Sequence, residues 1–151
     1  MKRKKIFKYT DFIGFKTANE IINYLESYRV KCIGEGCSRR VYRISPNKVI
    51  KIQHDWELNQ NKVEAGLSDN ISHKHIAKVH WYHHKYLWII ADYATKINSK
   101  IAQKWCENNY NYFLNNFGID DLCEFNVGRV NGKIVVIDYG WQEDILSKLE
   151  V

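Results

Sequence analysis

The sequence predicts an α+β fold in one domain of 151 residues, with an antiparallel sheet in its first part and helices in its second. Short apolar runs rich in β-branched and aromatic residues recur between turn residues as far as residue 91, and they predict strands. From about residue 97 the apolar residues recur at helical spacing instead. The change falls at residues 92–95. We therefore expect a strand-rich lobe at residues 1–94 and a smaller helical lobe at residues 95–151.

The first lobe is expected to contain two helices and five strands. A capping box with Thr17 as N-cap and Glu20 three residues later predicts the start of the first helix. Asp55 is expected to be the N-cap of the second helix, which carries Val63 and Leu67 on one stripe. Apolar runs bounded by turn residues predict the strands. They are expected at residues 30–33, 41–44, 49–52, 78–82 and 86–91.

In the second lobe, an apolar stripe predicts a helix over residues 97–117, and Gly118 is the residue expected to end it. Asn131 and Gly132 lie between two apolar runs, which is a strong local signal for a tight hairpin. The hairpin strands are expected at residues 126–130 and 133–137, and a last helix at residues 141–149. The stripe of the long helix consists of Ala102, Cys106, Tyr110, Phe113 and Phe117.

Composition narrows the class of protein. The formal net charge of +6 favours anionic partners such as a nucleotide, a nucleic acid or an acidic protein surface. The longest apolar run, residues 87–91, is too short to cross a bilayer, and no apolar segment of a signal peptide follows the basic start. The four cysteines form no CxxC pair and have no disulfide-framework spacing. We expect a cytoplasmic protein with reduced thiols and no membrane contact.

Three polar residues late in the chain form a pattern suited to a metal ion and phosphates. Asp121 and Asn126 lie before the predicted hairpin, and Asp138 follows its last strand. Carboxylate and amide oxygens suit a hard cation such as Mg²⁺, so Asn126 and Asp138 are candidate metal ligands. Asp121 would then accept a hydroxyl proton or orient a nucleophile. Each residue alone also fits ordinary turn chemistry, but the three in this order favour a site.

Residues further upstream supply the other groups that a phosphate site needs. Gly34 and Gly36 lie between two strands, where backbone N–H groups can approach phosphate oxygens without obstruction by side chains. Lys51 lies on the third strand, and its ammonium can pair with phosphates if a carboxylate orients it. Glu64, turned inward beside the apolar stripe of its helix, is the preferred carboxylate. Glu57, two turns earlier on nearly the same face, is the alternative.

In this order the motifs resemble those of the protein-kinase-like fold. The segment from Asp121 to Asn126 is similar to the catalytic loop D-L-x-x-x-N, and residues 138–140 resemble the D-F-G metal motif. Residues 49–51 resemble V-A-I-K, and residues 34–41 resemble G-x-G-x-x-G-x-V. The resemblance covers roughly residues 30–141, and very small kinase-like proteins of viral type are the nearest likeness.

The resemblance implies a minimal two-lobed fold, with an antiparallel sheet and a helix in the N-lobe and a strongly truncated helical C-lobe. It also implies ATP and Mg²⁺ as cofactors. The catalytic roles would fall to Asp121, Lys51 and Glu64, and the metal ligands would be Asn126 and Asp138. The nucleotide contacts that it implies are Gly34, Gly36, Arg39, Val41, Lys51, Asp92 and Ala94.

The chain departs from the family pattern at three points. Arg39 stands where the family has the third glycine of its loop, so the cover over the phosphates differs or adds a cation. The H-R-D motif reads Ile119-Asp120-Asp121, so the arginine that would bind a phosphorylated activation loop is absent. Only 11 residues follow Gly140, and we therefore expect no helical platform of the kind on which kinases hold peptide substrates.

The leading hypothesis is an ATP- and Mg²⁺-dependent phosphotransferase of the kinase-like type. A protein Ser or Thr hydroxyl is the first choice of acceptor, and a small molecule is the second. The alternative is a catalytically inactive or weak kinase-like module that acts by binding a partner protein. A basic nucleic-acid-binding protein is the least favoured hypothesis. The many Asn, Lys, Ile and Tyr residues hint at a viral source, and thus at the host cytoplasm.

Overall fold

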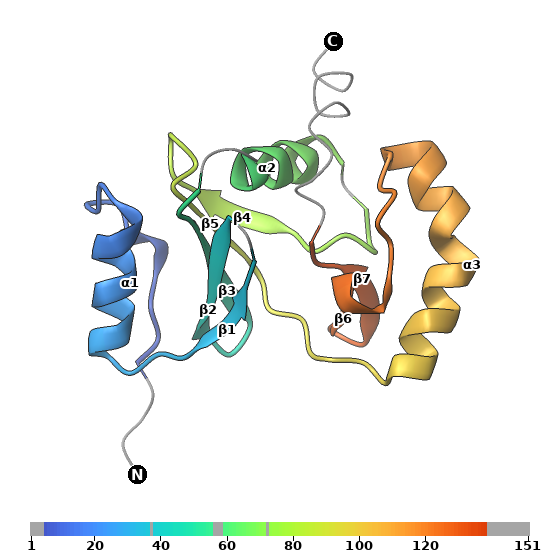
Figure 1. The fold of residues 1–151 in the computed structure, drawn as a ribbon, viewed down its shortest axis with the longest axis horizontal. Coiled ribbons are helices and arrows are strands. Elements are labelled where there is room, and N and C mark those ends of the chain that lie inside the picture. Colours follow the sequence, from blue (N-terminus) through green and yellow to red (C-terminus); the bar gives the residue numbers. More distant parts are fainter. Residues whose placement is uncertain (1–4, 37, 56–58, 72, 139–151) are drawn as a thin grey trace.

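A computed structural model of the chain describes residues 5–36, 38–55, 59–71 and 73–138 (Figure 1). The described part is a mixed α+β structure with a five-stranded antiparallel sheet, three α-helices and a separate two-stranded hairpin. This confirms the α+β class. The elements are η1 (Tyr9–Asp11), α1 (Ala18–Ser27), β1 (Cys32–Glu35), β2 (Arg39–Ser45), β3 (Lys48–Gln53), α2 (Gln60–Asn70), β4 (Val79–Tyr82), β5 (Trp88–Asp92), α3 (Ser99–Phe117), η2 (Glu124–Asn126), β6 (Val127–Val130) and β7 (Lys133–Val136).

The main sheet has the strand order β1-β2-β3-β5-β4, with every neighbouring pair antiparallel. Successive residues of a strand point to opposite faces of a sheet. Ile50 and Ile52 of β3 therefore join a core on one face, while Val49 joins a second core on the other face together with Ile89 and Ala91 of β5. The register sets Val41 opposite Lys51, so these two residues share the face of Val49.

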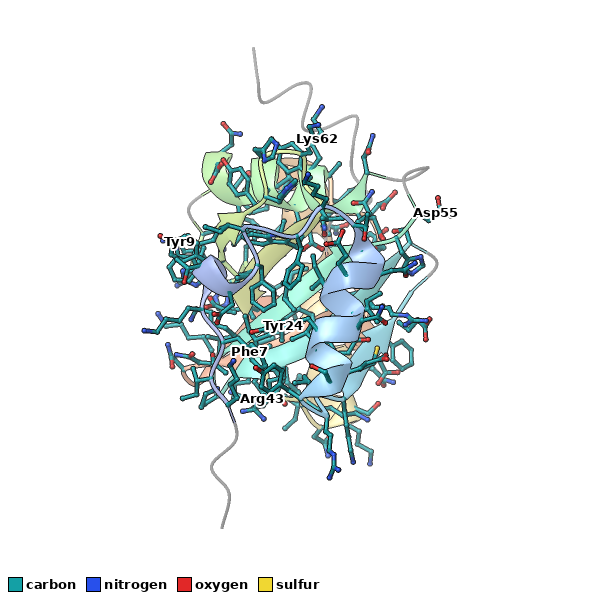
Figure 2. All side chains as sticks on the ribbon, turned by 90° about the vertical axis from the view of Figure 1, so that its left-hand side faces the viewer. Phe7, Tyr9, Tyr24, Arg43, Asp55 and Lys62 are labelled. Atoms are coloured by element: carbon teal, nitrogen blue, oxygen red, sulfur yellow. The ribbon has the colours of Figure 1, made fainter. Side chains whose placement is uncertain are left out.

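Helix α1 and the chain before it cover the face of Ile50 and Ile52. Thr17 caps this helix by accepting a hydrogen bond from the backbone N–H of Glu20, as its capping box predicts. The helix buries Ile21, Ile22 and Leu25 against the sheet. Figure 2 shows Phe7 and Tyr24 packed where the N-terminal segment lies beside α1.

Helix α2 covers the opposite face and joins two cores. Ala65 packs with the sheet residues around Val49, whereas Val63 and Leu67 pack into a third core with α3 and the hairpin β6–β7. One helix therefore contacts both the main sheet and the second part of the molecule. Figure 1 shows α2 lying between α1 and α3, above the sheet.

The second part of the fold consists of α3 and the hairpin β6–β7. Helix α3 buries Ala102, Cys106 and Phe113 and ends at Gly118, whose φ of 64° is the left-handed conformation that favours glycine at this position. The stripe expected from the sequence is thus confirmed in part. Tyr110 is 36% exposed, so the buried face of the helix is narrower than expected.

Two short backbone bridges attach the hairpin β6–β7 to the segments that precede β4 and follow β5. Thr95 pairs with Arg129 in an antiparallel bridge, and Ile76 pairs with Val136 in a parallel one. At the first bridge the two chain segments approach closely, because a Cβ atom added to Gly128 would lie 2.5 Å from the Cβ of Ala94. Only glycine fits there without a shift of the backbone.

One expectation for the first part of the chain needs correction. Asp55 is not the N-cap of α2, because the helix begins at Gln60 with Asn59 before it. The backbone N–H groups of His54 and Asp55 instead donate to the carbonyl of Ser38, which ties this segment to the start of β2. The helix expected at residues 141–149 lies outside the described residues.

None of the helices in the described ranges combines the length and the apolar composition that a membrane-spanning segment needs.

Replacement of Gly128 by Ala is expected to lower the free energy of unfolding by about 1–3 kcal/mol, because the new methyl group collides with Ala94. Urea unfolding of both proteins measures the change. Gly14→Ala is the matched control, since nothing lies within 4 Å of its added Cβ. Unchanged stability of Gly128→Ala would contradict the close approach, and adding Ala94→Gly to it should restore part of the loss.

Candidate functional site

A buried ion pair joins β3 to α2. The ammonium Nζ of Lys51 lies 2.8 Å from Oε2 of Glu64, and the side chain of Glu64 is only 1% exposed. Lys51 occupies the sheet face that α2 covers, and Glu64 belongs to the buried side of that helix. Glu64 is the partner that the sequence favoured, and the alternative Glu57 lies outside the described residues.

Arg39 adds a second cation to the same carboxylate. Its Nη2 lies 2.7 Å from Oε1 of Glu64 and 3.1 Å from Oδ1 of Asp138. The residue is 5% exposed and stands opposite Gln53 in the register of β2 and β3, on the sheet face of Lys51. The arginine found in place of a loop glycine therefore points into the structure and not into solvent.

Buried amide side chains support these charges, and sequence reasoning did not identify them. Asn61 accepts a hydrogen bond from Nη1 of Arg39 at 3.2 Å and donates to the carbonyl of Lys51 at 3.1 Å. Gln53 accepts the backbone N–H of Asn61, and Ser38 donates to Gln60. A usable signal existed, because Asn61 precedes Glu64 by three residues and so shares its helix face.

Ile137, the residue before Asp138, is hydrogen-bonded to this cluster. Lys51 Nζ donates to the carbonyl of Ile137 at 2.6 Å, and the N–H of Ile137 donates to the carbonyl of Asn126 at 2.9 Å. These bonds hold the segment after β7 against both the sheet and η2. The structure thus brings together Arg39, Lys51, Glu64, Asn126 and Asp138, which are far apart in the sequence.

Asp121 and Asn126 are held together at the loop before the hairpin. Nδ2 of Asn126 donates to the backbone carbonyl of Asp121 at 2.9 Å and to its Oδ2 at 3.3 Å. The other carboxylate oxygen, Oδ1, is buried and has no hydrogen-bond partner among the described residues. A buried acceptor of this kind is costly, so it marks a position where a ligand group would be stabilising.

The electrostatics of Glu64 are set by its two cations. Burial alone would raise its pKa, but Arg39 and Lys51 lower the pKa from 4.5 to about 2. Because the pKa is depressed in the folded protein, Glu64 contributes stability at pH values above its ordinary pKa. This contribution is lost progressively as the pH falls from about 4.5 to about 2.

The two aspartates behave in the opposite way. Burial raises the pKa of Asp121 to about 6, and the neighbouring Asp138 carboxylate adds to the rise. Burial is the largest cause that raises the pKa of Asp138, and the Glu64 carboxylate raises it further. Lys51 and Arg39 act against this shift. A cation placed near both aspartates would relieve their repulsion.

The glycines of the predicted phosphate loop lie at the edge of the sheet. Gly34 belongs to β1 opposite Val41, and a Cβ on it would make only ordinary contact with that side chain. The N–H of Gly36 donates to the carbonyl of Arg39 at 2.9 Å and so closes the turn between β1 and β2. In this structure that N–H is used within the turn rather than left available for a phosphate.

Asp92 and Ala94 lie at the connection between β5 and α3. The carboxylate of Asp92 is bound by His80 at 2.7 Å and by Lys48 at 3.4 Å, which tie it to β4 and β3. Ala94 is placed against Gly128 of the hairpin. No hydrogen bond or ion pair within the described ranges joins the Asp92 carboxylate to the Lys51–Glu64 pair.

The oxygen donors of the site fit a Mg²⁺ ion bound together with phosphates. Within the described part of the chain, no three His, Cys, Asp or Glu side chains lie close enough to form a complete metal cage. Mg²⁺ commonly uses one or two carboxylates and completes its shell with substrate phosphates and water. Asp138 and the amide oxygen of Asn126 match that requirement.

A cavity of about 510 Å³ borders the same loop on α3. None of the residues predicted to bind nucleotide or metal lines it, so it is separate from the charged cluster. Most of its wall is apolar, and Phe125 at its edge is 83% exposed. Its lining residues are Gln103, Cys106, Glu107, Tyr110, Leu122, Cys123, Glu124 and Phe125.

No protein-family model matches the chain, and no curated protein matches it at significant similarity. Function therefore has to be inferred from the geometry of the site, because a fold class alone does not specify an activity.

Replacement of Glu64 by Gln is expected to lower the free energy of unfolding by about 3 kcal/mol at neutral pH, because two buried cations lose their shared charge. Chemical unfolding gives this value. The control is Glu35→Gln, whose ion pair with Arg40 is largely exposed and should be worth little. Equal stability of the two variants would contradict the structural role assigned to Glu64.

Replacement of Asp121 by Asn is expected to stabilise the protein at pH 7.5 by about 1–2 kcal/mol, after allowance for solvent screening. The raised pKa means that the ionised carboxylate disfavours the folded state. The gain should shrink as the pH falls through about 6 and vanish below about 4, where Asp121 is protonated in both states. Unfolding curves across this range measure it, and a gain independent of pH would contradict the assignment. Asp69→Asn, on the exposed end of α2, is the control.

Proposed function

We propose that the protein is an ATP- and Mg²⁺-dependent phosphotransferase of the protein-kinase-like type. The single observation that carries this proposal is the buried Lys51–Glu64 pair, whose lysine also contacts the residue before Asp138. An ion pair of this kind orients a lysine toward nucleotide phosphates in kinases. It joins the sheet to the metal-binding candidates in one charged cluster.

The arrangement of the elements supports a two-lobed kinase-like fold. A five-stranded antiparallel sheet precedes the long helix α3, and α2 is inserted between β3 and β4. Lys51 lies on β3 and Glu64 on the inserted helix, which is the pairing that the resemblance implies. The loop with Asp121 and Asn126 and the segment with Asp138 flank the hairpin β6–β7.

In this proposal the nucleotide phosphates bind at the charged cluster. Lys51 holds them, and Glu64 fixes the direction of its ammonium. Arg39 supplies a second cation close to Asp138. Asn126 and Asp138 would hold Mg²⁺, which would neutralise phosphate charge when bound. Catalysis in this class depends mainly on positioning and on charge neutralisation, so a small scaffold is sufficient.

Asp121 is the group proposed to accept the proton of the attacking hydroxyl. Its unpartnered Oδ1 can accept a hydrogen bond from the hydroxyl of the phosphoryl acceptor, while its Oδ2 is held by Asn126. A raised pKa makes Asp121 a better base than an ordinary aspartate. The oxygen of the hydroxyl then forms its bond to the γ-phosphorus, ADP leaves, and the proton remains on Asp121. We propose a protein Ser or Thr as acceptor, with a small molecule as second choice.

A non-catalytic role in binding a partner protein is the second candidate, and the cavity beside α3 favours it. Phe125 is the most exposed of the large apolar side chains described, and it borders an apolar recess. Exposed apolar surface of this kind is typical of interaction sites. This candidate needs neither nucleotide nor metal, so the same binding measurement separates the two functions.

ATP with Mg²⁺ is expected to raise the thermal unfolding temperature of the wild-type protein, because a ligand that binds only the folded state stabilises it by about 2.7 kcal/mol at 100 times its dissociation constant. Asp138→Asn should lose the Mg²⁺-dependent part of the shift.

Lys51→Ala should lose most phosphoryl transfer, measured with radiolabelled ATP and a mixture of candidate acceptors.

Asp120→Asn is the matched control, since this exposed aspartate lies next to Asp121 but has no proposed contact with metal or nucleotide. It should retain the full shift. Transfer that survives in both Asp138→Asn and Lys51→Ala would overturn the site. An absent shift at millimolar ATP in the wild-type protein would favour the partner-binding role.

A further inference from the structure

Arg39 is the most unusual member of the charged cluster. It is 5% exposed, and among the described residues its guanidinium contacts three side chains from two other parts of the chain. Nη2 binds Glu64 at 2.7 Å and Asp138 at 3.1 Å, while Nη1 binds Asn61 at 3.2 Å. A planar guanidinium can make several directed bonds at once, which an ammonium on a flexible stem does less well.

The described side chains of the cluster balance in charge. Lys51 and Arg39 are opposed by Glu64 and Asp138, and both Arg39 and Glu64 are buried. Removal of one partner from a buried pair leaves an uncompensated charge and is costly. A ligand that takes Asp138 away from Arg39 therefore binds more favourably when it brings new negative charge near the guanidinium.

Asp138 is also the only carboxylate proposed to bind the metal directly in the kinase-like scheme, and its Oδ1 already accepts from Arg39. A divalent cation and the guanidinium thus compete for the same carboxylate. Nucleotide phosphates would supply the missing negative charge, because they can accept from the released N–H groups of Arg39. Glu64 and Asn61 would still hold the remainder of the guanidinium.

We propose that Arg39 is an internal counter-ion that holds Asp138 in the ligand-free protein and couples metal binding to nucleotide binding. This inference rests on the proposed function. In the absence of nucleotide, Arg39 disfavours the metal at Asp138. When nucleotide is bound, the phosphates compensate Arg39 and Asp138 is released to the metal. The coupling is reciprocal, so metal must strengthen nucleotide binding by the same factor.

Mn²⁺ binding to the purified full-length protein tests this, with free Mn²⁺ measured by electron paramagnetic resonance. Titrations are made with and without a non-hydrolysable ATP analogue. Arg39→Gln should bind Mn²⁺ alone about tenfold more tightly than the wild-type protein does. In the same variant the analogue should improve Mn²⁺ affinity by a smaller factor than in the wild-type protein, because the competing guanidinium is gone.

Arg40→Gln is the matched control, because it removes the same charge from the next residue of β2. Arg40 pairs with Glu35 at 3.2 Å, and both side chains are at least 36% exposed. This variant should bind Mn²⁺ as the wild-type protein does, with and without the analogue. An equal gain in both arginine variants would mean that net charge alone sets the affinity, and it would overturn the inference.

Far-UV circular dichroism and thermal unfolding establish whether each variant is folded. If Arg39→Gln does not fold, the titrations are made with Arg39→Lys instead. Lysine keeps a positive charge for Glu64 but lacks the forked guanidinium that also reaches Asp138. This variant should bind Mn²⁺ alone about threefold more tightly than the wild-type protein. Wild-type affinity in the folded Arg39 variant overturns this inference alone. No Mn²⁺ binding by any protein, even with the analogue, overturns the proposed function as well.

Discussion

The burial of the Glu64 carboxylate is the constraint on which the arrangement of the site depends. A charge removed from water requires partners of opposite sign. Here Lys51 and Arg39 provide them from two adjacent strands, each within 2.8 Å. These two ion pairs therefore favour the observed position of helix α2 along the sheet. The same helix carries Ala65 into one core and Leu67 into another, so its position also fixes how α3 and the hairpin meet the sheet.

Alternation along the strands explains why the cluster forms at this face. Ile50 and Ile52 bury themselves under α1, which leaves Lys51 on the side of α2. Antiparallel pairing then sets Arg39 opposite Gln53, on that same side. The apolar residues determine the orientation of β3, and this orientation determines the sheet face on which the charged side chains lie. Apolar packing on the α1 face of the sheet thus places the charged side chains on the α2 face.

Much of the fold could be predicted from the sequence, because strands and helices leave local signals. The predicted capping box of α1 and the predicted end of α3 at Gly118 are confirmed, because each depends on neighbouring residues alone. Asp55 is not the N-cap that the sequence predicts, because its segment is held by Ser38, a contact that local patterns do not encode. The pairing of Lys51 with Glu64 follows from helix and strand periodicity. The inward direction of Arg39 does not, since it depends on the pairing of β2 with β3 and on Glu64 and Asp138, which lie further along the chain.

The cluster also has a consequence for the order in which the chain folds. The contacts of Glu64 with Lys51 and Arg39 span 13 and 25 residues, whereas Arg39 and Asp138 are separated by 99. Short loops close with less loss of entropy than long ones. During synthesis on the ribosome, the sheet and α2 can associate before residue 138 has emerged. Until residue 138 arrives, Glu64 is the one carboxylate of the described cluster beside Lys51 and Arg39. Docking of the segment after β7 therefore adds neutralisation of charge to the gain from packing.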